Sequence, residues 1–537
     1  MNDHRTIVWI AALACLLIAG CQKNLDETAY EFACEDEGDC TGDYECLPSP
    51  DHDTKTCQIP GDAGPDTSDA DDVSDAEDGD AVDQDVRDVD DTADDVVDDT
   101  DDDGDACQET NGGEEICDGL DNDCDGEVDE GLPFKARALA AGDGHVCAVN
   151  SDNEVWCWGS NVTDEAAPES GVDMDVVRRP RLIDELTTTT DLSHLDAGDT
   201  HTCVLNGDKT LHCWVDNTDS QLGTGSGASG SLNSWSEDDP VYGLQAGDRF
   251  NCIEFVKMTQ NMPKTEVYCW GLTSSNRMGS VQGDMTYGTP TKVMSARENS
   301  GGFLALGDDH GCLLSTPIAS SEATEVTCWG SNFRGKAGVE GTSTIDRTTL
   351  ESDFTSESGN SKGLLSASLG GTFSCGLNEQ ELLCWGSNGA GQLAQPASLE
   401  SSHEPETIGL PSGNSVASYL EGAFSTLATG ERHGCAIDTG GELFCWGAGT
   451  SGEIGDGNES DRFGATAPDG NRTYAFVAAG DGFTCAIEAY SDPETDGTVY
   501  CWGKNDGHQL GLGLEVEEPD NQTTPQPVAC APLEDGG

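Results

Sequence analysis

Basic residues are scarce in this 537-residue sequence, which has 24 Lys and Arg against 103 Asp and Glu and a formal net charge of −79. Electrostatic attraction to phosphate backbones and to anionic lipid head groups is therefore replaced by repulsion. The composition argues against a nucleic-acid-binding protein.

The N-terminus lacks an apolar run long enough to span a membrane. The run from Ile7 to Ile18 is short and is followed by Ala19 and Gly20, which predicts a secretory signal peptide over residues 1–20. The stretch that ends at Cys21 resembles the lipobox of bacterial lipoproteins, which implies that Cys21 is lipidated. We therefore expect an exported protein at an outer membrane or cell surface, in contact with the membrane through its lipid anchor only.

Close C-x-x-C spacing is missing from seven cysteine pairs that recur along the chain, so these pairs do not suggest zinc sites. A total of 24 cysteines without that spacing favours disulfides in an oxidising compartment. Recognisable catalytic motifs are also missing: there is no nucleophile elbow, phosphate-binding loop or zincin motif. We therefore do not expect an enzyme.

The segment after Cys21 divides into two parts. Residues 21–60 have almost no apolar core and would depend on disulfides among four cysteines, whose pairing the sequence leaves open: Cys34, Cys40, Cys46 and Cys57. Residues 61–105 contain 22 acids and a single base, Arg87, which predicts a disordered, self-repelling linker.

In residues 106–132 the acidic residues from Asp121 to Asp129 are separated by single other residues and do not form a continuous run. The order D-x-D-x-D-G places carboxylates on one side of a tight loop, a pattern suited to Ca²⁺. The stretch resembles a short metal-binding motif of bacterial surface proteins and, in part, an EF-hand loop, although Leu132 stands where an EF-hand has its bidentate Glu. We predict a structural Ca²⁺ site made by Asp121, Asp123, Asp125, Glu127, Asp129 and Glu130.

Residues 133–531 contain seven copies of one hairpin. In the first copy, an apolar run from Ala138 to Ala141 ends at a Gly-Asp turn, His145 to Val149 forms a strand, and Glu154 to Trp158 returns antiparallel. The two cysteines of the hairpin would face each other within disulfide distance. The seven predicted disulfides are Cys147 with Cys157, Cys203 with Cys213, Cys252 with Cys269, Cys312 with Cys328, Cys375 with Cys384, Cys435 with Cys445, and Cys485 with Cys501.

Tryptophan follows the second cysteine in every copy, and glycine comes next in six of them. The combination of A-G-x-x-H-x-C, C-W-G-x-N and G-Q-L-G resembles the regulator-of-chromosome-condensation repeat, in the disulfide-bearing form of secreted bacterial proteins. The resemblance implies an all-β, seven-bladed β-propeller, and the seven copies agree with it. A solenoid is the rival, but it would need capping repeats.

The two ends of the repeat region are expected to complete one blade together. Cys530 lies just after the closing strand and makes an even number with three cysteines before the repeats. We predict that it pairs with one of Cys107, Cys117 or Cys124, ahead of a short tail over 532–537.

His145, His201, His310 and His433 occupy equivalent positions and are expected to make structural hydrogen bonds, since a ring of repeats would hold them apart. The tryptophans are expected to pack between blades.

The function that follows is a non-enzymatic scaffold for a protein or glycan, bound through the variable loops. A sialidase-like hydrolase would need Asp-box motifs that are missing, a purely structural envelope protein stays open, and nucleotide exchange on a GTPase is not expected. The sequence does not predict the oligomeric state.

Overall fold

The computed structural model describes residues 33–34, 45–48, 55–58, 132–162, 166, 175–183, 192–215, 217–224, 230–232, 241–259, 262–279, 286–296, 300–317, 324–341, 343–350, 364–378, 381–411, 426–490, 496–513 and 520–530. The chain forms two units, residues 1–104 and 105–537. The predicted signal peptide, the lipidation site at Cys21, the linker and the Ca²⁺ motif lie outside the described residues.

The described residues of the first unit form one small antiparallel sheet. Its strand order is β1-β3-β2, with β1 at Ala33–Cys34, β2 at Glu45–Pro48 and β3 at Lys55–Gln58. In its backbone register Cys46 lies opposite Cys57.

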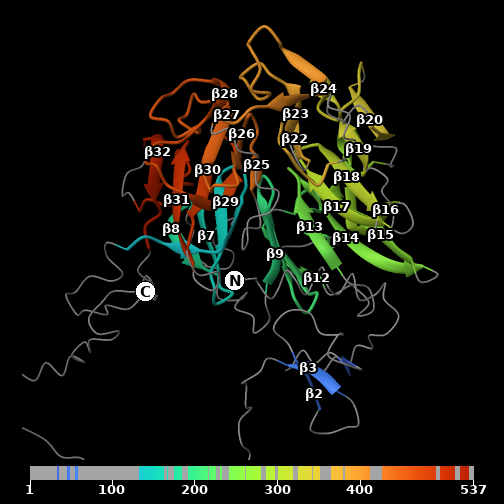
Figure 1. Ribbon diagram of the computed structural model, residues 1–537. Helices are drawn as coiled ribbons and strands as arrows, with labels where there is room; N and C mark the ends of the chain where they lie inside the picture. The colour runs from blue at the N-terminus through green and yellow to red at the C-terminus, as the bar shows by residue number, and fades with distance from the viewer. Residues whose placement is uncertain are drawn as a thin grey trace, which may run out of the picture. The chain divides into compact units, whose positions relative to one another are not determined.

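The second unit is built from antiparallel sheets, one for each sequence repeat (Figure 1). We number them sheets 1 to 7. Sheet 1 contains β5 (Ala138–Ala141), β6 (His145–Val149), β7 (Val155–Ser160) and β8 (Val176–Leu182). Sheet 2 contains β9 (Leu192–Ala197), β10 (His201–Asn206), β11 (Leu211–Val215) and β12 (Gly230–Leu232). Sheet 3 contains β13 (Val241–Ala246), β14 (Phe250–Thr259), β15 (Met262–Leu272) and β16 (Thr286–Ser295).

The remaining sheets repeat the same order. Sheet 4 contains β17 (Ser300–Leu306), β18 (His310–Pro317), β19 (Glu325–Ser331) and β20 (Thr344–Thr349). Sheet 5 contains β21 (Ser366–Leu369), β22 (Phe373–Leu377), β23 (Leu382–Ser387) and β24 (Ser401–Ile408). Sheet 6 contains β25 (Leu427–Thr429), β26 (His433–Ile437), β27 (Leu443–Gly447) and β28 (Arg462–Thr466). Sheet 7 contains β29 (Tyr474–Ala479), β30 (Phe483–Glu488), β31 (Gly497–Gly503) and β32 (Gln522–Pro527).

The predicted hairpins are confirmed. The bounds of β5 and β6 match the expected strands, and in each of the seven sheets the two cysteines lie directly opposite each other. All seven pairs are disulfide-bonded, with Cα atoms 4.1 Å apart. The hairpin frame therefore stays constant although the sequence separation between the cysteines ranges from 9 to 17 residues.

The C-W-G motif interrupts the regular pairing of the third strand in six of the seven sheets, and sheet 2, which has Val215 in place of the glycine, shows no such shift. In sheet 1 the register with β8 shifts between Cys157 and Gly159, and the φ angle of Gly159 is +106°. A residue with a side chain rarely adopts that conformation, which explains why glycine follows tryptophan in six copies.

Neighbouring sheets pack through their tryptophans. Trp158, Trp270, Trp329, Trp385, Trp446 and Trp502 are fully buried. The indole nitrogen of Trp446 donates to the carbonyl oxygen of Gln392, 2.8 Å away, in the loop of the preceding sheet. Trp158 makes the same bond, at 3.0 Å, to the carbonyl of Gln509 in the loop after β31. The expected packing role of the tryptophans is confirmed, and this contact links sheet 7 to sheet 1.

The sheets contact one another through their first strands. Each first strand contacts the next one in the order β5, β9, β13, β17, β21, β25 and β29, and β29 contacts β5. These contacts do not merge all the sheets into a single hydrogen-bonded sheet. Sheets 3 and 4 are the exception, because β15 pairs with β17 at Lys264 and Ser300 and joins the two into one eight-stranded sheet.

The two ends of the repeat region meet at sheet 7. The short strand β4 (Lys135–Ala136) pairs with β31. The backbone of Val499 in β31 donates to the carbonyl of Phe134 and accepts from the amide of Val528. Both ends therefore bond the same edge of one strand, as the sequence led us to expect.

Helical structure in the described residues is limited to two short 3₁₀ turns, η2 (Ser274–Asn276) and η3 (Phe333–Gly335). Across the described part of the chain, no helix has the length and apolar character that a membrane crossing requires. Cys530 is buried and disulfide-bonded, but the choice among Cys107, Cys117 and Cys124 lies outside the described residues.

Candidate functional site

Seven equivalent glycines form close contacts between neighbouring sheets. A Cβ atom added to Gly142 would lie less than 3.0 Å from the carbonyl oxygen of Gly198, and each glycine faces the next in the same way until Gly480 faces Gly142. None of the seven has a positive φ angle, so they are required for space and not for conformation. We call them the axial glycines: Gly142, Gly198, Gly247, Gly307, Gly370, Gly430 and Gly480.

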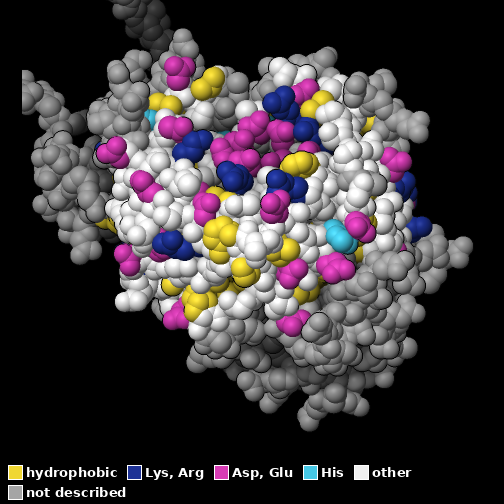
Figure 2. Space-filling view, turned by 90° about the horizontal axis from the view of Figure 1, so that it is seen from above, with side chains coloured by type: hydrophobic (Ala, Val, Ile, Leu, Met, Phe, Trp, Pro, Cys, Tyr) yellow, Lys and Arg dark blue, Asp and Glu magenta, His cyan; other side chains and the backbone are white. Residues whose placement is uncertain are grey.

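The residue after each axial glycine is acidic in six of the seven repeats. We call these six side chains, which are exposed or half-buried, the axial acids: Asp143, Asp199, Asp248, Asp308, Glu431 and Asp481. Backbone bonds hold neighbouring turns together, since the amide of Asp199 donates to the carbonyl of Asp248 at 3.1 Å. Figure 2 shows acidic side chains gathered in a hollow near the middle of one face, with Lys and Arg side chains beside them.

The remaining repeat, sheet 5, has Gly371 in place of an acid. The carboxylate of Asp308 occupies the space that a side chain on Gly371 would need. The ammonium of Lys336, from the loop after β19, is buried here and donates to the carbonyl oxygen of Gly371 at 2.6 Å. It also forms an ion pair with Asp309. A cation therefore stands where the ring of carboxylates is interrupted.

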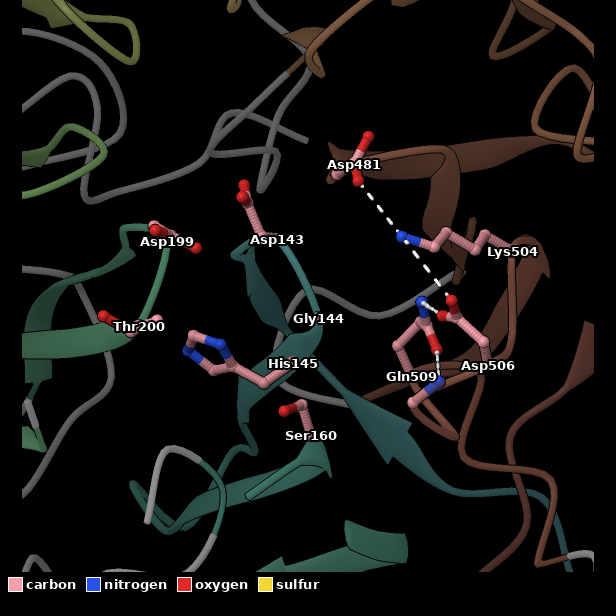
Figure 3. Close-up of a pocket in the computed structure, with 11 residues that line it drawn as sticks. Asp143, Gly144, His145, Ser160, Asp199, Thr200, Asp481, Lys504, Asp506 and Gln509 are labelled. Atoms are coloured by element: carbon pink, nitrogen blue, oxygen red, sulfur yellow. Dashed lines mark hydrogen bonds and ion pairs between the residues drawn. The ribbon is translucent and has the colours of Figure 1, made fainter. Parts of the chain in front are cut away.

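A cavity of about 420 Å³ opens among the axial acids, where sheets 1, 2 and 7 meet. Figure 3 shows Asp143, Asp199 and Asp481 around it, with Lys504 between Asp481 and Asp506. The Lys504 ammonium lies 3.1 Å from the Asp481 carboxylate and 3.8 Å from that of Asp506. The cavity thus has four carboxylates and one ammonium in its lining, so its charge is negative at neutral pH.

Arginines compensate the axial acids on the side of sheets 2 and 3. The guanidinium of Arg249 lies 3.3 Å from both Asp219 and Asp248 and 3.8 Å from Asp199. Arg277 forms a second ion pair with Asp248, at 3.1 Å. Among the described residues no ion pair is made by Asp143, and Lys504 is the only Lys or Arg that lines the cavity.

The close carboxylates hold protons more tightly than isolated ones. Burial raises the pKa of Asp308 to about 7, although Lys336 opposes this shift. Burial and the like charge of Asp199 raise the pKa of Asp143 above its ordinary value. Carboxylates that share a site repel one another, and an external cation would relieve that repulsion. The chemistry of this face is therefore that of an acceptor for ammonium or guanidinium groups.

The four equivalent histidines have the structural role that the sequence predicted. All are buried, and each Nε2 atom bonds a polar side chain of the following sheet: Thr202 for His145, Asn251 for His201, Ser374 for His310 and Thr484 for His433. The proposed Ca²⁺ ligands from Asp121 to Glu130 lie outside the described residues. Within the described ranges, no group of three or more His, Cys, Asp or Glu is arranged to hold a metal ion.

The axial acids were missed by reasoning from sequence alone. The signal was present as a Gly-Asp or Gly-Glu pair before six of the seven strands that contain a first cysteine, but it was interpreted only as a turn. The sequence period shows that these turns are equivalent. It does not show that all of them face one axis.

Comparisons with known proteins agree with this architecture. Three segments match the Regulator of chromosome condensation (RCC1) repeat, at residues 136–163, 424–453 and 496–533. The solved structure of Prp20p from Saccharomyces cerevisiae is similar in fold, with 20% identity, a TM-score of 0.56, and coverage of 74% of this chain and 90% of that one. The described repeat region is thus an all-β fold of the RCC1-like propeller class.

Two curated relatives share parts of the sequence. The serine/threonine-protein kinase Nek9 of Mus musculus is 24% identical over 357 residues, which is 62% of this chain and 33% of Nek9. The ultraviolet-B receptor UVR8 of Arabidopsis thaliana is 30% identical over 169 residues, 31% of this chain and 34% of UVR8. The chain spans about a third of the length of either relative.

Proposed function

We propose that residues 133–531 form a closed seven-bladed RCC1-type propeller and that the protein is a non-enzymatic scaffold that binds a partner protein at its axial face. Seven sheets, the cycle of contacts between their first strands and the cycle of axial glycines support the closed ring. The matches to the RCC1 repeat at both ends and in the middle of this region support membership of that family.

One observation carries the functional proposal. The buried side chains that recur in every repeat are occupied in packing, whereas the axial acids converge on one face from six repeats and are not fully compensated by cations. A partner that presents Lys or Arg side chains would complete this charge balance. Prp20p, which shares this fold, has binding properties toward Gsp1p and histones, so binding of proteins by such a propeller has a precedent. A glycan bound through the variable loops is the second candidate.

The rest of the proposal concerns location. Cys21 is the lipidated first residue of the mature protein, residues 61–105 hold the propeller away from an outer membrane or cell surface, and a structural Ca²⁺ is held by the motif from Asp121 to Glu130. Metabolic labelling with a fatty acid, with Cys21→Ser as the negative control, tests the anchor. Calcium titration of the full chain with and without Asp121→Asn and Asp125→Asn tests the metal.

Capture of partners by the full chain from surface extracts, with and without Ca²⁺, tests the binding function. The captured partner is then titrated against a variant in which Asp143, Asp199 and Asp481 are all changed to Asn. The matched control changes Glu340, Glu404 and Glu459 to Gln, because these three are exposed, do not line the cavity and remove the same charge.

The expected result is a loss of affinity of at least tenfold in the axial variant, with affinity unchanged in the control. Equal losses of affinity in both variants would show that binding depends only on the net charge of the protein. If both variants keep their full affinity and the captured partner is a glycan, the glycan-binding interpretation is favoured. If nothing is captured, the purely structural interpretation is favoured. Turnover of a glycoside by the pure protein would favour the hydrolase alternative.

A further inference from the structure

One buried position shows a matched pattern at all seven contacts between sheets. It is the first residue of each second strand, three places after the axial glycine, and it is either His or Phe. The seven residues are all buried: His145, His201, Phe250, His310, Phe373, His433 and Phe483.

In the next sheet, the matched residue lies one place after the equivalent position. Its type depends on whether the residue at this position is His or Phe. Where the position is His, the next sheet provides a polar side chain, 2.7 to 3.0 Å from Nε2: Thr202, Asn251, Ser374 or Thr484. Where the position is Phe, the next sheet has Gly311, Gly434 or Val146, none of which has a polar side chain. The match holds at seven of seven contacts, including the one between sheets 7 and 1, which combines Phe483 with Val146.

The hydrogen-bond network fixes the tautomer of His310 and of His433. The hydroxyl of Ser374 donates to the carbonyl of Lys336 at 2.7 Å, so its only proton is used and Nε2 of His310 must donate to it. The same holds at His433, because the Thr484 hydroxyl donates to the carbonyl of Glu453 at 2.9 Å. The proton of the neutral ring is therefore on Nε2, and Nδ1 is the atom that an additional proton would occupy.

Among the described residues, no hydrogen-bond acceptor is available for a proton on Nδ1 of His145 or of His310. The Nδ1 atoms of His145 and His310 are buried without a hydrogen-bond partner. Both face an axial glycine, Gly142 or Gly307, whose missing Cβ makes room for the ring. A proton on Nδ1 would bury both a charge and an unsatisfied donor, each of which is costly.

We propose that the four histidine contacts are acid-sensitive joints in the ring of sheets. Acidification loosens the contacts between sheets 1 and 2, 2 and 3, 4 and 5, and 6 and 7, while the three phenylalanine contacts hold. One of the contacts that hold has an additional backbone link, because β15 pairs with β17 between sheets 3 and 4. The sheets would therefore separate into three pairs, sheets 7 and 1, 3 and 4, and 5 and 6, with sheet 2 alone, and the ring would not open at its terminal seam.

The groups that face these histidines support the direction of the effect. His145 faces His201 and Asp199, His310 faces Lys336, and His433 faces Asp481. Burial lowers the pKa of His145 and of His433 to about 4, even though an aspartate opposes the shift in both. Between pH 6.5 and 4 the unfolded chain then binds more protons than the folded one. The stability that each histidine contributes is present above this window and is lost as the pH falls through it.

The protein provides its own template for a test. His433→Phe combined with Thr484→Val copies the Phe483 and Val146 contact at the boundary between sheets 6 and 7. Urea unfolding of the full chain is measured at pH 8 and pH 5, with Thr484→Ser, which keeps the hydroxyl, as the matched control. The increase in the unfolding equilibrium constant from pH 8 to pH 5 is expected to be about 30-fold smaller in the double variant than in the wild type. The same increase in the double variant and in the wild type would overturn the proposal.

A second measurement on the wild type keeps the proposal testable if the double variant does not fold. Amide hydrogen exchange, corrected for the intrinsic effect of pH, is compared at pH 8 and pH 5 for strands β26 and β29 at a histidine contact and for β15 and β17, which pair across the phenylalanine contact of sheets 3 and 4 and contain none of the four histidines or their partners. Protection is expected to fall at pH 5 in the first pair of strands more than in the second. An equal loss in both pairs, or a larger loss in the second, would contradict it.

Discussion

The axial glycines and the axial acids are adjacent in sequence but obey opposite constraints. At the first position every repeat has glycine, because the carbonyl of the next repeat occupies the place of a side chain. At the second position the repeats differ, since most have Asp, one has Glu431 and one has Gly371, and the acids interact with one another across repeats, as Asp143 does with Asp199, Asp308 and Asp481. The invariant glycine keeps neighbouring sheets in contact, and the charge at the next position serves the recognition that we propose.

The difference teaches that repetition in a propeller has to be interpreted atom by atom. The Gly-Asp pair looks like a single turn motif. Its two residues nevertheless face different environments, since one packs on a neighbouring backbone and the other points along the axis. The following predictions separate the two roles, from the largest expected effect to the smallest.

The largest effect is expected at an axial glycine. Gly370→Ala places a Cβ against the carbonyl oxygen of Gly430, and the backbone cannot move without disturbing both neighbouring sheets. We expect a loss of more than about 3 kcal/mol in the free energy of unfolding, or no folded protein at all. Urea unfolding followed by tryptophan fluorescence measures it. Gly464→Ala in β28 is the control, since an added Cβ there meets no atom within 4 Å; equal effects would remove the steric argument.

The second effect concerns the disulfide frame. Changing Cys435 and Cys445 together to Ala removes the cross-link of the buried hairpin β26 and β27. The unfolded chain gains conformational freedom, so we expect a loss of about 2–4 kcal/mol. Chemical denaturation of the variant beside the wild type, both without reductant, measures it. A stability equal to that of the wild type would show that strand pairing alone holds the hairpin.

Glu254 is an exception inside the otherwise apolar frame. It is 5% exposed, its Oε2 atom has no hydrogen-bond partner, and the equivalent position two residues after the first cysteine is Val, Leu or Ile in the other six repeats. Burial raises its pKa to about 7. The folded chain then binds more protons between the ordinary pKa and 7, so its stability falls as the pH rises through that window.

Replacing this acid should therefore stabilise the protein. Glu254→Leu is expected to add about 1–3 kcal/mol to the free energy of unfolding at pH 8 and much less at pH 4. Thermal and urea unfolding at both pH values check this, and Glu254→Gln is the control that keeps the shape and removes the charge. A loss of stability at pH 8 would show that the carboxylate makes a stabilising contact in the folded protein.

The smallest effect on stability is expected at the axial acids. Asp143→Asn should leave the free energy of unfolding near pH 4 within about 0.5 kcal/mol of the wild type, because the carboxyl group is protonated in the folded chain at that pH and Asn is a neutral side chain of the same size. Since burial and Asp199 raise the pKa of Asp143, the folded wild type binds more protons than its unfolded chain from about pH 4 to about pH 9, so the variant should gain stability relative to the wild type as the pH rises through that window. A large loss at neutral pH would place Asp143 among the residues that hold the ring.

Much of the frame could be predicted from the sequence. The bounds of the first hairpin, the opposition of the cysteines, the buried tryptophans and the structural histidines all follow from local patterns that recur seven times, because strand alternation and turn residues act over a few positions. The meeting of the two ends at one sheet followed from counting strands. The partners of the histidines did not, because each lies in the next repeat, about fifty to sixty residues away.

By itself, the sequence determined the repeat, its hairpin and the excess of acid, since these depend on composition and on residues close along the chain. Only the tertiary structure decided that seven glycines share one cycle of contacts, that six carboxylates gather around it, and that His and Phe are matched to the residue of the next sheet. The physical reason is that these relations are made between repeats. A linear sequence shows that the repeats are equivalent, but only packing brings the equivalent atoms together.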